Sequence, residues 1–199
     1  MAAPASKTIS DLSGKWVLNK TLSDSVDSAL ALQGIRWLTR KAIGVATVEI
    51  EVKQYTDEEG KVHVHIEQTA SKLSSTTEKR TADWQPREHS DWLFGRVEGR
   101  TRFITAEQLA ELVAGEAVAK KWTKTDHLAR DWLAGEEEKT GPDGASLLLN
   151  HVEADAGWFA TQVWGFQNVG GERRYVRNVV VAKGDEFVEF KMIYDYVSE

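Results

Sequence analysis

The chain has 199 residues, of which 41% are hydrophobic and 28% are charged, and its formal net charge is −6. This length suffices for one domain with a substantial core, spanning residues 1–199, and the acidic balance disfavours nucleic acid, because phosphate backbones require a basic surface. Cysteine is absent, which excludes disulfides and thiolate chemistry, and no apolar run reaches the roughly 18–20 residues of a membrane-spanning helix. Because the first ten residues also lack the apolar stretch of a signal peptide, we expect a cytoplasmic protein that does not insert into membranes.

The first third of the chain carries signals for a strand, two helices and a hairpin, in that order. Gly14–Leu18 has the pattern of a short strand, and residues 23–43 place apolar side chains at the spacing of two short helices. Apolar and polar residues then alternate on both sides of an acidic turn, which predicts an antiparallel hairpin with strands near 46–55 and 61–69. The inward residues of this hairpin should be Val48, Ile50, Val64 and Ile66, and the outward residues should be Glu49, Glu51, His63 and His65.

Three more strands are expected before the middle of the chain. They lie at 76–84, 92–97 and 100–104, and Pro86 and Gly99 mark the breaks between them.

The segment 105–146 is predicted to be a helical insertion. Thr105 and Gln108 form a capping pattern ahead of an apolar run that stops at Gly115, and residues 126–134 have the pattern of a second helix. Four strands separated by short turn signals follow the insertion, at 147–153, 159–167, 173–181 and 187–197.

About ten strands in this order predict an all-β fold. Strands joined by short turns run antiparallel, and a long antiparallel series avoids exposed edges best by closing into a barrel. We therefore expect a closed antiparallel barrel with a two-helix lid at 23–43 and the insertion at 105–146. A sandwich of two sheets is the alternative.

Three short motifs occur in an order typical of intracellular lipid-binding proteins. They are Gly14-x-Trp16, the helical Leu38-Thr39-Arg40-Lys41, and Ile193-Tyr194 in the last strand. Through these motifs the chain resembles the fatty-acid-binding proteins of the calycin superfamily, which do not contain the helical insertion. The resemblance implies a calycin-like barrel whose helical pair covers a cavity for an apolar small molecule.

The same resemblance bears on the ligand. In that family an Arg-x-Tyr in the last strand holds a carboxylate, whereas here Met192 stands in the place of the arginine, two residues before Tyr194. Because methionine cannot donate charge-assisted hydrogen bonds, the head-group clamp is expected to be incomplete. A neutral or phenolic apolar ligand is then favoured over a fatty acid.

Two longer stretches, Leu32–Lys41 and Gly171–Arg177, carry a second likeness. Through them the chain is similar to small fungal proteins of natural-product pathways that lack recognised catalytic motifs, including the hetero-Diels-Alderases of tropolone sesquiterpenoid biosynthesis. This likeness implies a cofactor-free enzyme.

Residues typical of metal binding and conventional catalysis are sparse. His63-x-His65 places two imidazoles on one strand face, but Glu67 shares that face, so a solvated surface is preferred over the start of a metal site. No nucleophile elbow, phosphate-binding loop or dinucleotide fingerprint is present. We therefore expect neither a metal nor a cofactor.

The candidate site consists of arginines and aromatic residues on strands, with part of the lid. Arg102 or Arg177, assisted by Tyr194, is predicted to act catalytically by orienting a ligand carbonyl or hydroxyl, although ordinary packing is the alternative for each residue. The predicted ligand-binding residues are Trp37, Leu38, Trp164, Phe190 and Met192.

Two functions agree with this site. The first is a pericyclase, in which a shaped cavity supplies proximity and a hydrogen-bond donor activates a carbonyl. The second is a non-catalytic carrier that buries a lipid or another small molecule. Both require an apolar cavity with a few donors, so the sequence leaves the choice open.

Overall fold

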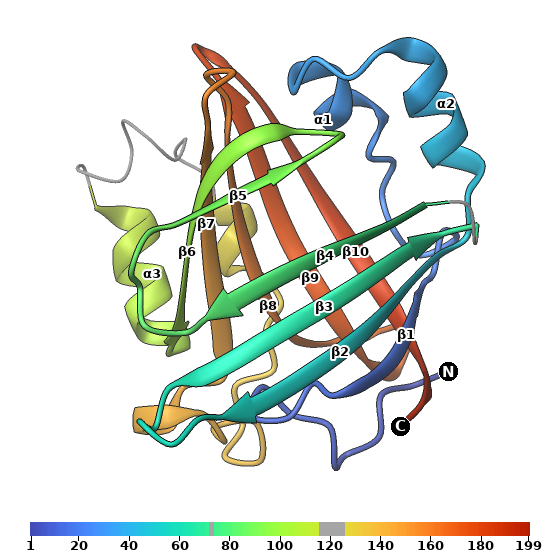
Figure 1. The fold of residues 1–199 in the computed structure, drawn as a ribbon. Helices are drawn as coiled ribbons and strands as arrows, with labels where there is room; N and C mark the ends of the chain where they lie inside the picture. Colours follow the sequence, from blue (N-terminus) through green and yellow to red (C-terminus); the bar gives the residue numbers. More distant parts are fainter. Residues whose placement is uncertain (72–73, 116–125) are drawn as a thin grey trace.

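The computed structural model describes residues 1–71, 74–115 and 126–199 (Figure 1). Within these residues ten strands form one antiparallel sheet that curls into a nearly closed barrel, and three α-helices lie outside it. The strands are β1 (Gly14–Leu18), β2 (Val48–Thr56), β3 (Val62–Ala70), β4 (Ser74–Thr81), β5 (Arg87–Asp91), β6 (Gly95–Ile104), β7 (Leu147–Ala154), β8 (Phe159–Val169), β9 (Glu172–Lys183) and β10 (Glu186–Ser198). The helices are α1 (Asp27–Leu32), α2 (Trp37–Val45) and α3 (Ala106–Ala114), with 3-10 turns η1 (Asp126–Ala129) and η2 (Pro142–Gly144). The predicted all-β class and antiparallel barrel are confirmed.

The strand order around the barrel is β4-β3-β2-β1-β10-β9-β8-β7-β6-β5. The two ends of this sheet, β4 and β5, do not pair with each other in the described part of the chain, and we call the gap between them the seam. Polar contacts cross the seam. Arg80 Nη1 on β4 donates to Asn150 Oδ1 on β7 at 3.3 Å, and the backbone N–H of Trp84 donates to the Thr101 carbonyl on β6 at 2.8 Å.

The hairpin of β2 and β3 has the predicted register and faces. The four inward residues, Val48, Ile50, Val64 and Ile66, are buried, and Glu49 and Glu51 are exposed. His63 and His65 lie on the outer face, where His63 Nε2 contacts Asp57 Oδ2 at 2.6 Å. Alternation predicts this hairpin correctly because one of its faces packs in the barrel and the other meets solvent.

The strands predicted at 92–97 and 100–104 are wrong in their boundaries. The chain forms β5 earlier, turns where the Asp91 carboxylate accepts from the N–H groups of Leu93 and Phe94, and then continues through Gly99 in one strand, β6. Gly99 does not break β6, because it faces inward, where an added Cβ would lie 3.7 Å from the Val152 side chain. A glycine at this position leaves room inside the barrel.

The insertion contains less helix than predicted. Thr105 and Gln108 form the expected capping box at the start of α3. The helix expected at 126–134 is reduced to η1, because Asp131 adopts a φ of +66° and Trp132 then forms a β-bridge with Gln167. The central part of the predicted insertion, 116–125, lies outside the described residues. No helix in the described ranges is long and apolar enough to cross a membrane.

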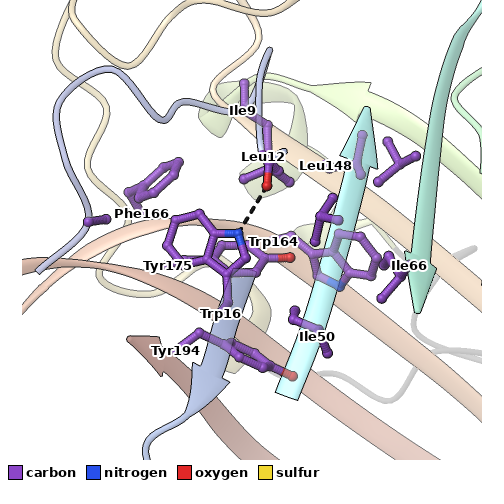
Figure 2. Close-up of a cluster of buried hydrophobic side chains, with 13 residues drawn as sticks. Ile9, Leu12, Trp16, Ile50, Ile66, Leu148, Trp164, Phe166, Tyr175 and Tyr194 are labelled. Carbon is purple, nitrogen blue, oxygen red and sulfur yellow. Dashed lines mark hydrogen bonds between the residues drawn. The ribbon is translucent and has the colours of Figure 1, made fainter. Parts of the chain in front are cut away.

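One end of the barrel is filled by an apolar and aromatic cluster (Figure 2). Trp16 is fully buried there, and its indole N–H donates to the Leu12 carbonyl at 3.0 Å. Its ring lies 5.2 Å from that of Tyr175, and Trp164 and Tyr194 belong to the same cluster. The N-terminal segment therefore closes this end, which we call the barrel floor.

A second apolar cluster lies between the outer face of the sheet and the insertion. It joins Ile104, Leu147 and Val180 on the strands to Leu109 on α3 and Leu128 on η1. Because the insertion covers this side, strands β7 to β9 carry buried residues on both faces. Figure 1 shows α3 beside β6, away from the end of the barrel where α1 and α2 lie.

Candidate functional site

The barrel contains a cavity of about 970 Å³ between the floor cluster and helices α1 and α2. Its wall near the helices includes the apolar side chains of Leu30, Phe94, Trp158, Val179, Val181 and Phe190, beside polar residues of the helical segment such as Asp27, Gln33 and Arg40. A third buried cluster places Ala29 of α1 against this wall. A space of this size and lining can hold an apolar small molecule.

Polar side chains gather where the cavity meets the barrel floor. Arg177 comes from β9, Tyr194 from β10, and Glu78 and Arg80 come from β4. Strand pairing places Arg177 near Tyr194. Tyr194 pairs with Tyr175 on β9, and Tyr175 and Arg177, two residues apart, both face the interior. The floor therefore offers charged groups to a ligand whose other parts contact apolar walls.

Arg177 is a buried cation with few protein partners. Only 5% of the surface of Arg177 is exposed, and its Nε donates to the Tyr175 hydroxyl at 3.0 Å. The guanidinium carbon lies 4.0 Å from the ring centre of Trp164 and 5.0 Å from that of Tyr194. Neither Nη atom has a hydrogen-bond partner among the described residues. Such a group gains stability from a ligand acceptor, since an unsatisfied buried donor is costly.

Met192 is the direct cross-strand partner of Arg177. Strand β9 therefore supplies a guanidinium opposite the methionine, although β10 itself lacks the arginine of the Arg-x-Tyr pattern, so the incomplete head-group clamp stays a prediction. Tyr194, two residues further along β10, completes the pairing of a guanidinium and a phenol. The sequence analysis proposed Arg177 together with Tyr194 but left Arg102 as the alternative, and the two groups come from different strands.

The two tyrosines at the floor are neutral hydrogen-bond donors at physiological pH. Burial raises the pKa of Tyr194, and it also raises that of Tyr175, in each case more than the neighbouring Arg177 lowers it. The Tyr194 hydroxyl contacts only the Met192 sulfur among described hydrogen-bond acceptors, at 3.8 Å. Because a thioether is a weak acceptor, this hydroxyl can also donate to a ligand.

Glu78 and Arg80 form an ion pair on the side of the cavity that borders the seam. Arg80 Nε and Nη2 both donate to Glu78 Oε2, at 3.0 and 2.6 Å. Burial alone would raise the pKa of Glu78, but the charges of Arg80 and Arg177 outweigh it and hold that pKa below its usual value. Glu78 is therefore an anion at neutral pH.

The structure brings together four of the eight predicted site residues in the cavity wall: Arg177, Tyr194, Phe190 and Met192. Trp164 is fully buried beneath the Arg177 guanidinium. Trp37 and Leu38, at the start of α2, are 61% and 73% exposed and lie outside the wall, to which α2 contributes Arg40 and Ile43.

Arg102 lies on the opposite face of β6 from the cavity residue Thr101. Its guanidinium carbon is 4.8 Å from the ring centre of Trp84, and burial lowers its pKa. Of the two arginines proposed from the sequence, Arg177 is the one that reaches the cavity.

Sequence reasoning missed Glu78 and Arg80. The strand that carries them reads Ser-Ser-Thr-Thr-Glu-Lys-Arg-Thr and contains no apolar residue that could mark its inner face. Their inward orientation follows from register, because Glu78 pairs with Ile66 and Arg80 pairs with Val64, both buried on β3.

No family model matches the chain. It is 28% identical over 200 residues to a probable pericyclase, scpY, of Mollisia scopiformis, covering 98% of this chain and 95% of that protein. It is also 28% identical over 199 residues to the pericyclase pydY of an Acremonium species, covering 99% and 97%. The chain is similar to pericyclases.

Solved structures show the same fold at lower identity. A fatty acid transporter, REP1-NXSQ, matches with a TM-score of 0.53 at 14% identity, covering 94% of this chain and 96% of that one. The fatty-acid-binding protein 1 of Echinococcus granulosus matches with a TM-score of 0.51 at 15% identity, covering 94% and 97%. These likenesses confirm the calycin-like barrel that the sequence motifs implied.

Proposed function

We propose that this chain is a cofactor-independent pericyclase of natural-product biosynthesis that performs a hetero-Diels–Alder reaction on an apolar substrate. The observation that carries the proposal is the Arg177 guanidinium, whose Nη groups have no partner among the described residues at the end of an apolar cavity. The similarity to two pericyclases over nearly the whole chain supports it.

In the proposed reaction a conjugated carbonyl compound acts as a heterodiene toward an alkene. One carbon–carbon and one carbon–oxygen σ bond form while three π bonds become one, so no proton, electron or leaving group is exchanged. The cavity holds the two reacting parts in contact, which replaces an encounter in solution by a reaction within one complex. An Nη group of Arg177 donates to the carbonyl oxygen, and the Tyr194 hydroxyl provides a second donor. Both withdraw electron density from the heterodiene as the carbon–oxygen bond forms.

The test uses an ortho-quinone methide, released in buffer from a stable precursor, and an electron-rich alkene. Binding of the alkene and of the stable precursor is first measured by calorimetry, and the enantiomer ratio of the cycloadduct is then measured by chiral chromatography. Wild-type protein should give an enantioenriched adduct faster than the background reaction. Arg177→Met should form the adduct roughly 30- to 1,000-fold more slowly and with lower enantiomeric excess.

A carrier is the second candidate, because the barrel shares its fold with a fatty acid transporter. A carrier would bind both compounds and leave the adduct racemic in wild type. That result would contradict the pericyclase proposal and support the carrier.

A further inference from the structure

The Glu78 carboxylate presents one oxygen to the cavity. Glu78 lies on the inner face of β4, and its side chain retains 38% of its surface. Both hydrogen bonds from Arg80 end on Oε2, so Oε1 has no hydrogen-bond partner in the described part of the chain. Oε1 is not fully buried, and Glu78 is one of the residues that line the cavity.

Glu78 and Arg177 face the same cavity without forming an ion pair. Each charge shifts the pKa of the other group toward its ionised form. Even so, no nitrogen–oxygen distance within 4.0 Å joins the two side chains among the residues described. The floor thus holds an acceptor on one strand and a donor on another, with space between them. Opposite charges held apart in this way form a complementary pair of contacts for a polar ligand head.

We propose that Glu78 accepts a hydrogen bond from an O–H or N–H of the substrate while Arg177 donates to its carbonyl. The site then selects a head group that combines a conjugated carbonyl with a hydrogen-bond donor, such as a phenolic enone. This inference rests on one part of the proposed function, namely that the substrate occupies the cavity. It does not require that the protein catalyse the reaction.

Exclusion of water makes the contact selective. A ligand without a donor would cover the Glu78 carboxylate and leave it unsatisfied, and the loss of a hydrogen bond to a charged group corresponds to at least about tenfold in affinity. A ligand with a suitably placed donor avoids this loss. The difference between two such ligands is therefore larger than any effect of their small difference in apolar area.

The experiment compares three hydroxychalcones, with the hydroxyl at position 2, 3 or 4, and their O-methyl ethers. The isomers vary the distance between carbonyl and hydroxyl. Dissociation constants are measured by calorimetry for wild type, Glu78→Gln and the control Glu67→Gln, which alters an exposed carboxylate on the outer face of β3. At least one hydroxychalcone should bind wild type and the control about tenfold or more tightly than its ether.

In Glu78→Gln this preference should vanish or reverse. If Arg80 retains the amide oxygen, the amide NH₂ faces the cavity and becomes a donor. Affinity for the ethers should be retained or increased, whereas a merely structural role of Glu78 would weaken both members of a pair equally. Equal binding of every pair to wild type, or a preference that survives in Glu78→Gln, would overturn the inference. Failure of all six compounds to bind would instead contradict the proposed cavity site itself.

A second measurement needs no variant. Ring-fluorinated forms of the preferred hydroxychalcone are stronger hydrogen-bond donors, so their affinity for wild type should rise as the acidity of the phenol increases. Their O-methyl ethers serve as controls for the added fluorine. No dependence on phenol acidity would overturn the role of Glu78 even if Glu78→Gln did not fold.

Discussion

Replacement of Arg177 by methionine should make the protein more stable and less active at the same time. Methionine keeps a long flexible side chain over Trp164 and removes the charge. Desolvation of a cation amounts to several kcal/mol, and Arg177 has no carboxylate within ion-pair distance among the described residues. Against this stand one hydrogen bond to Tyr175 and the contacts with aromatic rings, each of about 1–2 kcal/mol.

The balance predicts a gain of about 1–2 kcal/mol in the free energy of unfolding for Arg177→Met. In a chain of this size such a gain raises the melting temperature by about 2–8 °C. The loss of one charged hydrogen bond in the transition state should raise the barrier by about 2–4 kcal/mol, which is roughly 30- to 1,000-fold in rate.

Urea unfolding followed by tryptophan fluorescence measures the first quantity, and initial rates of cycloadduct formation measure the second. The substitution thus raises the stability and lowers the rate, as expected for a buried donor that lacks acceptors in the free protein and binds the substrate in the complex. A variant that unfolds at lower urea and retains the wild-type rate would refute the reasoning, because Arg177 would then be a structural residue.

Three other substitutions test separate parts of the structure. Glu138→Gln breaks a buried pair in which Arg173 donates to both carboxylate oxygens, at 2.6 and 2.7 Å, and should lower the free energy of unfolding in urea by about 3–5 kcal/mol; a loss below about 1 kcal/mol would contradict this. The hydrogen bonds from Arg87 lower the pKa of Asp83 from 3.8 to about 2, so its stabilising effect is present above pH 3.8 and is lost as the pH falls to about 2. The stability difference between wild type and Asp83→Asn should therefore shrink over that range, and a constant difference would refute the assignment. Arg102→Met should change the rate of cycloadduct formation by less than about threefold, because the side chain lies outside the cavity; a larger loss would return Arg102 to the site.

The sequence predicted the parts of the fold in which one strand face is apolar and the other is polar. The hairpin of β2 and β3 is the clearest example, since a one-residue shift would have exchanged its faces. The strands beneath the insertion gave no such contrast. Their runs of leucine and valine, as in Leu147–Leu149 and Val179–Val181, are buried on both faces, so alternation could not orient them.

Arg102 stood as an alternative to Arg177 for the same reason. Ile104, on the same face of β6 as Arg102, is buried against α3, while Phe103 on the opposite face packs in the floor cluster. Apolar residues thus mark both faces, and the inward face could not be recognised from the sequence.

The sequence also could not show how far along the barrel axis each residue lies. Arg173, Tyr175 and Arg177 alternate along β9 and so share a face, but Arg173 pairs with Glu138 below the floor while Arg177 reaches the cavity. Only the register of β9 with β8 and β10, together with the N-terminal segment that fills the floor, separates their roles.

The seam gives the barrel a mechanical property that a fully paired sheet would lack. Arg80 holds Glu78 with one part of its guanidinium and reaches Asn150 across the seam with another. A ligand that binds Glu78 would therefore also contact the group that links β4 to β7 across the seam. Amide hydrogen exchange along β4 and β6 should then slow when the cavity is occupied, so that the rigidity of the wall reports the state of its floor.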